Sequence, residues 1–321
     1  EKMKVVVWQA ITSGTTVHVA QAEELGIEYD SLVSLYGQIF VRNLKAEIRT
    51  LTEDRAQRIA QRVEGGESLL NIAKEFTFGT LKLAKYYVDN SKKHGDIQLS
   101  NLITNPSQIR DERIRVELLQ LIENDPVCSP DLELVKECLG REYEELLNSL
   151  LTQRHMCFET EAELRSRGKP KTPDILFLVP MATKAMDWDN LGEDSHDHHD
   201  KNANTTDRRN SETKPTGSNK QFAKYGSHLT EQSCTKVINW IDSKAMFADA
   251  HTFRENLDQF RGYNNRYGRG MVIYWHGFVE DIANCIDDDM VLVRDVFPDD
   301  WMFPTGEPAD GRIPAFDNIE L

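Results

Sequence analysis

The sequence predicts an α/β protein, in which an all-helical N-terminal region precedes a mixed sheet with the element order helix, strand, strand, strand, helix, strand. Three observations support this prediction. Residues 1–100 read as helices separated by short turns. A short strand is expected at 155–158, and two apolar, β-prone runs follow at 175–179 and 237–244, each with charged residues at one end. A helical pattern at 250–267 separates the second run from a third, at 270–275.

Composition divides the chain into four parts. These are the helical region at 1–100, a connector at 101–129 with a helix expected at 111–124, the mixed-sheet domain at 130–302 and an acidic tail at 303–321. The tail contains prolines, and we expect it to be flexible. A polar stretch at 187–232 interrupts the sheet domain. Because it has no apolar periodicity, we expect it to be disordered.

Two stretches of the N-terminal region look like helix-turn-helix units, in which short helices pack at a steep angle across a tight turn. The first lies at 17–39 with Gly26 at its turn, and the second lies at 68–88. Lys82 and Lys85 fall on the side of the last helix that we expect to be exposed, where they would neutralise DNA phosphates. A plain helical bundle is an equally good interpretation of the same pattern.

The bulk composition is that of a globular protein, with 39% hydrophobic and 28% charged residues. No apolar run approaches the roughly 20 residues that a membrane-spanning helix needs, so we expect no membrane partner. The five cysteines are widely spaced without a CxxC pair, which argues against a disulfide framework or a zinc cluster. The net charge of −15 opposes nucleic-acid binding. However, twelve acidic and two basic residues follow position 279, so most of the excess lies there.

Charged residues mark one end of each of the two central predicted strands. Asp174 opens the run at 175–179, whereas Asp242 and Lys244 close the run at 237–244. Because strand side chains alternate between faces, Asp242 and Lys244 point the same way. Charges in apolar runs are costly unless they are paired or hold a metal. The structural alternative is that Asp242 pairs with Lys244 while Asp174 caps a turn.

Phosphodiester hydrolysis is the chemistry that suits these residue types. It needs a cation that neutralises charge developing on phosphorus and lowers the pKa of an attacking water. Mg²⁺, for which Mn²⁺ could substitute, takes one or two carboxylates and completes its shell with waters and substrate phosphates. We expect Asp174, Asp242 and the Ser243 carbonyl to supply oxygens. Lys244 would stabilise the transition state.

Helical spacing places further residues beside this site. Glu144 borders an apolar stripe on the predicted helix 140–151 and could hold a metal or its water. Gln259 and Tyr263, four residues apart on one helix face, could steady Lys244 or the scissile phosphate. A basic cluster just before the first of the two charged strands would hold an incoming phosphate backbone. The cluster comprises Arg165, Arg167, Lys169 and Lys171.

The residues themselves also resemble the TPD family, which is named for a Thr-Pro-Asp motif. In this chain the motif stands within residues 171–177, Lys-Thr-Pro-Asp-Ile-Leu-Phe. The similarity is dense from 102 to 278 and loose before that. Other matching stretches are 105–109, 140–144, 164–168, 240–245 and 265–275.

The resemblance implies a restriction-endonuclease-like PD-(D/E)xK core, related to archaeal Holliday-junction resolvases, behind a helix-turn-helix region. The family's active-site positions fall on Asp174, Asp242 and Lys244. On the first helix, Glu144 is the matching carboxylate and Glu142 is a rival. The resemblance also implies a protein of the nucleus, with a cytoplasmic pool, that binds codanin. The long polar interruption departs from the family pattern but leaves these residues intact.

Three functions stay open on the sequence alone. The first is a metal-dependent nuclease acting on DNA, possibly structured, or on another nucleic acid. The second is a scaffold that binds codanin in chromatin or histone handling, which would have no chemical need for the charged residues at the strand ends. The third is a helix-turn-helix regulator. Its DNA binding would survive loss of Asp174 and would depend on Lys82 and Lys85.

Overall fold

The computed structural model describes residues 2–50, 52–75, 80–91, 105–184, 235–279, 281–282, 291–303 and 309. The chain forms two compact units. The first comprises residues 1–149 and 243–252, and the second comprises residues 150–242 and 253–321. The polar interruption predicted at 187–232 lies outside the described residues, as does the predicted tail 303–321 apart from residues 303 and 309.

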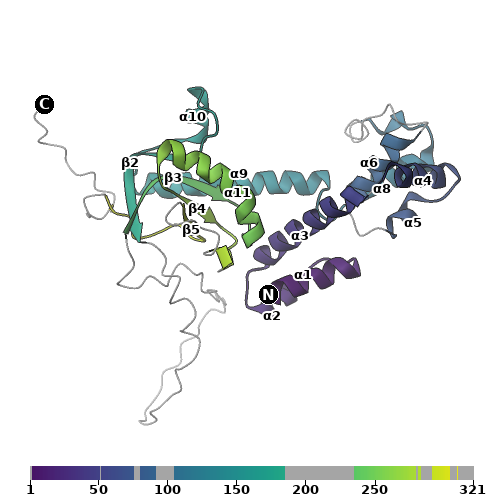
Figure 1. Cartoon of the computed structure of the whole chain (residues 1–321), viewed down its shortest axis with the longest axis horizontal. Helices are drawn as coiled ribbons and strands as arrows, with labels where there is room; N and C mark the ends of the chain where they lie inside the picture. The colour runs from purple at the N-terminus through teal and green to yellow at the C-terminus, as the bar shows by residue number, and fades with distance from the viewer. Residues whose placement is uncertain are drawn as a thin grey trace, which may run out of the picture. The chain divides into compact units, whose positions relative to one another are not determined.

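Helices account for the regular structure that is described within residues 1–149 of the first unit (Figure 1). They are α1 (Lys2–Ser13), α2 (Val19–Leu25), α3 (Tyr29–Thr50), α4 (Glu53–Glu64), α5 (Leu69–Ala73), α6 (Thr80–Asn90), the 3-10 helix η1 (Pro106–Gln108), α8 (Glu112–Glu123) and most of α9 (Pro130–Gln153). Across the described residues, no helix combines the length and the apolar character that crossing a membrane requires.

The first unit has two packing centres. One joins α1, α2 and α3, and the other joins α4, α5, α6 and α8. In the second, α6 buries Leu83, Ala84, Tyr87 and Val88, whose spacing makes one apolar stripe. The helix predicted at 111–124 is confirmed as α8. Helices are also present at both predicted helix-turn-helix stretches, and Gly26, at φ 68°, ends α2. Their DNA-binding role stays a prediction.

The second unit is built on a five-stranded mixed sheet in the order β1-β2-β3-β4-β5. Its strands are β1 (Phe158–Thr160), β2 (Ile175–Lys184), β3 (Thr235–Lys244), β4 (Gly270–Tyr274) and β5 (Val291–Arg294). The β1–β2 and β2–β3 pairs are antiparallel, and the β4–β5 pair is parallel. The short helix α10 (Glu161–Ser166) follows β1, and α11 (Ala250–Tyr267) follows β3. The predicted mixed α/β architecture is thereby confirmed.

Several element boundaries differ from the prediction. The first strand lies at 158–160 and not at 155–158, because residues just before it close the end of α9. His155 has φ 53°, and the amide of Met156 donates to the carbonyl of Leu151 at 3.1 Å. The second strand does not stop at Pro180. The proline is accommodated where the β2–β3 register shifts, and a bulge tolerates the missing N–H.

Other differences concern elements that the sequence pattern did not indicate. Strand β5 has four residues and α10 has six, which is too short for a periodic signal. The helix predicted at 140–151 is the end of the longer α9, which begins at Pro130, a residue suited to the first helical position. The helix at 250–267 is confirmed with the same bounds.

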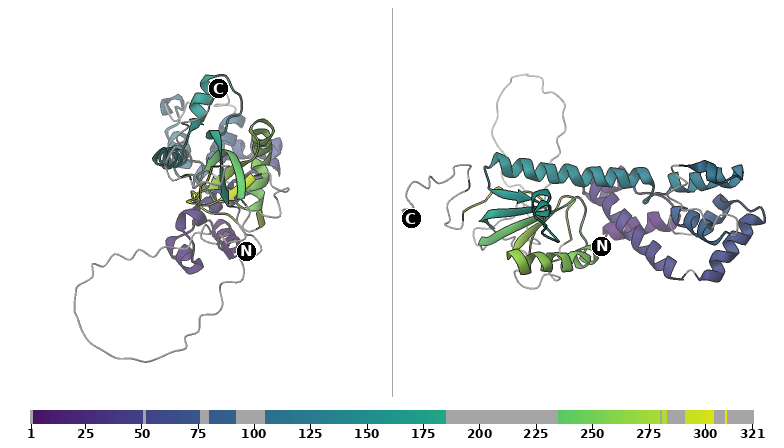
Figure 2. Two further views of the ribbon diagram at one scale, coloured as in Figure 1. Left: turned by 90° about the vertical axis from the view of Figure 1, so that its left-hand side faces the viewer. Right: turned by 90° about the horizontal axis from the view of Figure 1, so that it is seen from above.

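The helix α11 lies beside β3 and β4 (Figures 1 and 2). Aromatic side chains pack it against both strands. Trp240 stacks on Phe260 with ring centroids 6.2 Å apart and meets Tyr263 edge-on at 5.1 Å. Its indole nitrogen donates to the Gly268 carbonyl at 2.8 Å. A Cβ at Gly270 would lie 2.0 Å from the Trp240 ring, so only glycine fits there. α11 therefore covers one face of the sheet at a fixed position.

The end of β2 remote from Asp174 is held by the chain that follows β5. Asp300 accepts hydrogen bonds from the Thr183 hydroxyl at 2.7 Å and from the Lys184 amide at 2.8 Å. Trp301 packs edge-on against Phe177 at 5.6 Å. In the predicted tail, Ala309 is buried, and its amide donates to the Trp301 carbonyl at 2.9 Å.

Candidate active site

The antiparallel pairing of β2 and β3 brings two of the predicted acidic residues together. Ile175 pairs with Ile241 and Leu176 with Trp240. Extending this register by one residue places Asp174 opposite Asp242. Because directly opposed residues of an antiparallel pair share one face, the two carboxylates lie side by side at the strand ends.

A third carboxylate, Glu161, lies across from Asp174 on the β1 side. Thr160 pairs with Ile175, and the Glu161 amide donates to the Asp174 carbonyl at 2.9 Å. Burial raises the pKa of the Tyr263 phenol most, and the charges of Asp242, Asp174 and Glu161 raise it further. The Tyr263 phenol on α11 therefore lies close enough to all three carboxylates to interact with their charges.

Sequence reasoning missed Glu161, although a local signal was present. Thr160 and Glu163 form a capping box, in which Glu163 Oε2 accepts from the Thr160 amide at 2.7 Å. The pattern Thr-x-x-Glu predicts a helix start, and a helix start directly after a strand places the next residue at the strand end. Glu161 occupies that place.

The Thr-Pro-Asp motif is anchored by polar contacts on both sides of its backbone. Thr172 is 3% exposed, and its hydroxyl donates to Glu161 Oε1 at 3.3 Å. Its carbonyl accepts a hydrogen bond from the Tyr263 hydroxyl at 2.9 Å. Gln259 Nε2 in turn donates to the Tyr263 oxygen at 2.6 Å. Gln259 and Tyr263 thus hold the motif that presents Asp174, which is a different task from the predicted contact with Lys244 or a phosphate.

The loop just before the motif is held from the same helix. Arg266, three residues after Tyr263 on α11, donates to the Pro170 carbonyl and, at 3.1 Å, to the Lys171 carbonyl. Lys171 has φ 52°, a conformation that costs a side-chain-bearing residue about 1–2 kcal/mol. The contacts from α11 therefore stabilise a strained turn that leads directly into the motif.

Two of the four predicted phosphate-binding residues form ion pairs. Arg165 lies 2.6 Å from Glu161, and Arg167 lies 2.5 Å from Glu159. The arginine side chains are 68% and 60% exposed, so each pair contributes at most about 1 kcal/mol. Their guanidinium groups are held near the strand ends and still face solvent. In the same segment, the Lys169 ammonium lies 6.0 Å from the centre of the Tyr267 ring.

The remaining predicted site residues lie at varied depths. Ser243 and Lys244 end β3 and are half-buried, and the Lys244 carbonyl accepts from the Met246 amide at 2.7 Å. Lys244 comes two residues after Asp242, so the strand directs both side chains to one face. Glu144 and Glu142 are exposed residues of α9 in the first unit. Of the two predicted DNA-binding lysines on α6, Lys82 is half-buried and Lys85 is exposed.

The oxygen donors at the strand ends are of the kind that Mg²⁺ takes as ligands. Within the described ranges, no three or more His, Cys, Asp and Glu residues are arranged to hold a metal ion. Mg²⁺ does not need such a cage, because it binds through one or two carboxylates and keeps several waters. Asp242 is 1% exposed and Asp174 is half-buried, which gives one shielded and one accessible carboxylate.

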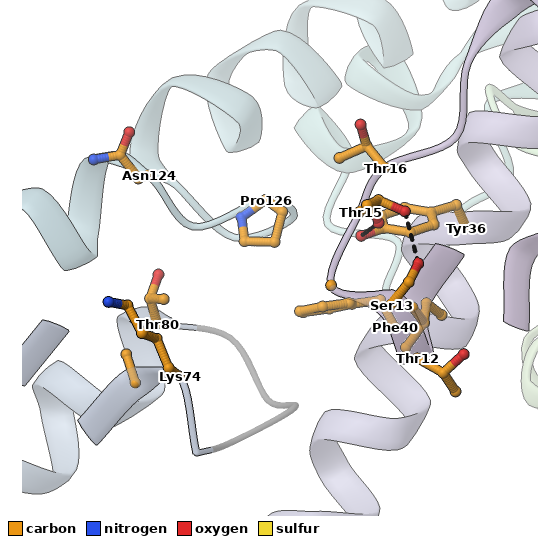
Figure 3. Close-up of a pocket in the computed structure, with 13 residues that line it drawn as sticks. Thr12, Ser13, Thr15, Thr16, Tyr36, Phe40, Lys74, Thr80, Asn124 and Pro126 are labelled. Carbon is orange, nitrogen blue, oxygen red and sulfur yellow. Dashed lines mark hydrogen bonds between the residues drawn. The ribbon is translucent and has the colours of Figure 1, made fainter. Parts of the chain in front are cut away.

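A cavity of about 440 Å³ lies in the first unit, where residues from the α1–α2 connection, α3 and the ends of α5, α6 and α8 meet (Figure 3). Several hydroxyl groups line it, and Figure 3 shows Ser13 and Thr15 joined by a hydrogen bond of 2.9 Å. Thr80, on the opposite wall, donates to the Leu121 carbonyl at 2.6 Å. None of the candidate active-site residues lines this cavity.

Comparisons with known proteins give one family and a set of named relatives. A family model described as "Protein of unknown function TPD sequence-motif" matches residues 110–204 and 212–297. The chain is 26% identical over 285 residues to "CDAN1-interacting nuclease 1" of Bos taurus, covering 84% of this chain and 83% of the relative.

Two further proteins of the same name give similar values. The Homo sapiens protein is 26% identical over 283 residues, covering 84% of this chain and 83% of the relative. The Xenopus laevis protein is 29% identical over 238 residues, covering 72% of this chain and 62% of the relative. No solved structure matches.

Proposed function

The chain belongs to the TPD family, and on this basis we propose that it is a metal-dependent nuclease of the PD-(D/E)xK type that acts on DNA. The observation that carries the proposal is the β2–β3 register, which sets Asp174 opposite Asp242, with Lys244 two residues further along the strand. The relatives that carry the name nuclease support it.

Asp174 and Asp242 would hold Mg²⁺, or Mn²⁺ in its place, with the Ser243 carbonyl as a third oxygen. Because Asp242 is 1% exposed, its charge is weakly screened and attracts a cation strongly. When bound, the ion would neutralise charge on the scissile phosphate and lower the pKa of an attacking water. Glu144 would contribute a further carboxylate from α9.

Lys244 would supply a fixed positive charge on the same face as Asp242. Its ammonium would donate hydrogen bonds to the oxygens on which negative charge develops in the transition state. Such a donor is effective only if it is already in position, since a displacement of 1 Å can cost about 10²-fold in rate. The structure around Lys244 therefore matters as much as its charge.

The basic segment before the motif would bind the substrate backbone. Four positive charges fall within seven residues, from the last turn of α10 into the loop that follows it: Arg165, Arg167, Lys169 and Lys171. Contacts to phosphates position a nucleic acid without reading its sequence. We therefore propose recognition of DNA by backbone and shape, in keeping with the relation to Holliday-junction resolvases that the family resemblance implies. Lys82 and Lys85 would add phosphate contacts from α6.

The partner proposal comes from the relatives' printed name, CDAN1-interacting nuclease 1. We propose that this chain also binds CDAN1, the codanin expected from the sequence, and that it acts in the nucleus with a cytoplasmic pool. The same name motivates the second candidate function, in which the chain serves codanin as a scaffold and cleavage is dispensable. The two candidates differ in whether the strand-end residues are needed for chemistry.

A substrate panel tests the proposed function. Purified full-length chain would be incubated with labelled single-stranded, duplex, flap and four-way-junction DNA and with matching RNA, in Mg²⁺, in Mn²⁺ and in chelator. Lys244→Ala should abolish cleavage, whereas Lys236→Ala, at the other end of β3, should not. Metal-dependent cleavage lost only with Lys244 would support the nuclease. A folded wild-type chain that binds codanin and cleaves nothing would favour the scaffold.

A further inference from the structure

The chain directly after β3 is held by a polar stripe on α3. The stripe consists of Ser34, Gln38 and Arg42, which are spaced four residues apart and so share one helix face. The chain that it holds runs from Phe247 to Thr252. All of these residues belong to the first unit.

Two residues of the stripe form hydrogen bonds with the backbone amide and carbonyl of Phe247. The Phe247 amide donates to Ser34 Oγ at 2.9 Å, and Gln38 Nε2 donates to the Phe247 carbonyl at 2.6 Å. Phe247 is 5% exposed, and buried backbone groups need such partners. The position of this residue is therefore set by side chains that lie more than 200 positions away in the sequence.

The third residue, Arg42, binds the start of α11. Its guanidinium donates to both oxygens of Asp249, at 2.7 and 2.8 Å, and to Thr252 Oγ1 at 2.6 Å. Asp249 also accepts from the Thr252 amide at 2.9 Å and so caps the helix. The Thr252 hydroxyl donates to Gln38 Oε1 at 2.5 Å, which closes the network.

Charge and burial make this network strong. Asp249 is 4% exposed, and a two-pronged arginine–carboxylate pair is among the strongest polar contacts in proteins. Burial acts to raise the pKa of Asp249, but the contacts from Arg42 and Thr252 outweigh it and lower the pKa to about 2. Asp249 thus stays ionised and keeps its hold on Arg42.

We propose that Ser34, Gln38 and Arg42 are positioning residues for Lys244, an inference that rests on the proposed function. Only two residues separate Lys244 from Phe247, and the amide of Met246 bonds back to the Lys244 carbonyl at 2.7 Å. The chain between the strand end and the stripe therefore has little slack. Fixing Phe247 and Asp249 fixes the end of β3 and the ammonium-bearing residue on it.

This assignment gives part of the N-terminal helical region a catalytic task. α3 would belong to the active-site support, and not to a separable DNA-binding module in front of it. The stripe residues do not touch substrate in this account. They act through the segment 247–252, so their loss should change the rate of the chemical step more than substrate binding.

Chemical labelling of Lys244 tests the proposal without any need for activity. Full-length wild type, Arg42→Ala, Ser34→Ala and Arg49→Ala would be acetylated briefly with acetic anhydride, and the modification of Lys244 and Lys236 quantified by mass spectrometry. Arg49 is an exposed residue of the same helix and serves as the matched control. We expect Lys244 labelling to rise about fivefold in Arg42→Ala and about twofold in Ser34→Ala, with Lys236 unchanged, since rate scales with access to the amine.

The outcomes separate this proposal from the proposed function. Lys244 labelling at the wild-type level in both stripe variants would overturn the positioning role. Equal increases at Lys244 and Lys236 would also overturn it, because they would indicate general loosening of β3. If labelling responds as expected while the wild type cleaves no nucleic acid, the positioning role holds and the nuclease proposal alone fails.

Kinetics on whichever DNA the wild type cleaves provides the second readout. At a temperature where circular dichroism shows every variant folded, Arg42→Ala should lower kcat about 10²-fold and leave KM within about twofold. Arg42→Lys should recover part of kcat, because lysine keeps the charge but cannot form the two-pronged contact. An Arg42→Ala variant with unchanged kcat would contradict the proposal.

Discussion

The motif loop and the chain after β3 are held in two different ways. The loop before Asp174 is held by Tyr263 and Arg266 of α11, a helix of the same sheet domain, through contacts to backbone carbonyls. The chain after Lys244 is held by α3 of the helical region through a partly buried ion pair. The first support comes from the same domain, and its hydrogen-bond acceptors are uncharged carbonyl groups. The second comes from a helix more than 200 positions away in the sequence, and its acceptor is a carboxylate.

Because of this difference, we expect the two strand ends to respond differently to acid and to mutations in the helical region. Support by α11 needs only the sheet domain and should tolerate acid, because its acceptors are carbonyl groups that do not titrate near neutral pH. Support by α3 depends on a carboxylate and on residues far away in sequence. Asp174 lies next to the first support, whereas Asp242 and Lys244 both belong to the strand that leads into the second.

The largest expected effect is on metal binding at the proposed active site. Asp242→Asn should weaken Mn²⁺ binding at least about a hundredfold, because mutating residues that merely support a metal ligand already costs 10–100-fold. Mn²⁺ binding would be followed by the electron paramagnetic resonance signal of the free ion. Asp258→Asn, at a side chain 96% exposed on α11, is the control and should bind as the wild type. Equal Mn²⁺ binding by Asp242→Asn and Asp258→Asn would show that Asp242 is not a metal ligand.

The charged support predicts a pH dependence. The pKa of Asp249 in the folded protein is about 2, below its ordinary value of 3.8, so its contribution is present above pH 4 and is lost as pH falls toward 2. The shift corresponds to about 2 kcal/mol. Asp249→Asn keeps a helix-capping side chain, and it should be less stable than wild type by roughly that amount at pH 6. The difference in unfolding free energy between Asp249→Asn and the wild type, measured by urea unfolding, should disappear near pH 2.

A difference in unfolding free energy between Asp249→Asn and the wild type that stays constant from pH 6 to pH 2 would contradict this prediction. It would mean that the α3 support does not depend on the ionised carboxylate. The Glu163→Gln variant offers a contrast on α10, because the Thr160 backbone and hydroxyl contacts lower the pKa of this exposed carboxyl. We expect only a small pH-dependent difference there, since an exposed group is screened by solvent.

The neutral support predicts a smaller, pH-independent effect. Tyr263→Phe removes the hydroxyl that bonds to the Thr172 carbonyl, at a cost of about 1 kcal/mol in unfolding free energy. Because the motif loop presents Asp174, kcat should fall roughly tenfold. Urea unfolding at pH 4 and pH 7 should give the same loss. A loss that varies with pH would show that the two supports are not distinct.

The smallest effect concerns the basic segment. Lys171→Gln should weaken DNA binding a few fold and lower the dependence of log affinity on log salt by about 1, the expectation for one phosphate contact. Fluorescence anisotropy of labelled DNA between 50 and 200 mM salt would measure it. Lys184→Gln, at the far end of β2, should keep the wild-type slope. An unchanged slope in Lys171→Gln would remove this residue from the substrate path.

Sequence patterns predicted the parts of the fold that rest on local periodicity. α11 was bounded correctly because an apolar helical stripe ends at Gly268, which has φ 84°. The strand ends with Asp174, Asp242 and Lys244 were indicated because charges interrupt apolar runs. Short elements such as β5 and α10 give no periodic signal. The capping box marks the start of α10, but only the pairing of β1 with β2 places Glu161 beside Asp174.

The α3 support could not be predicted from the sequence for a different reason. Ser34, Gln38 and Arg42 are ordinary polar residues for an exposed helix face, and nothing local marks them as partners of Phe247 or Asp249. Their role depends on contacts across more than 200 positions. The contact of Tyr263 with the Thr172 carbonyl, across 91 positions, has no local signal either. The helical spacing of Gln259 and Tyr263 predicts only that they share a face from which they could steady Lys244 or the scissile phosphate.

The most direct test of the central claim is single-turnover cleavage of labelled DNA by full-length protein with Mg²⁺, comparing wild type, Asp242→Asn and Asp258→Asn. We predict that wild type and Asp258→Asn cleave at the same rate, that chelator stops both, and that Asp242→Asn is slower by at least about 10³-fold. Cleavage by Asp242→Asn at the wild-type rate would contradict the assignment of the β2–β3 strand ends as the active site.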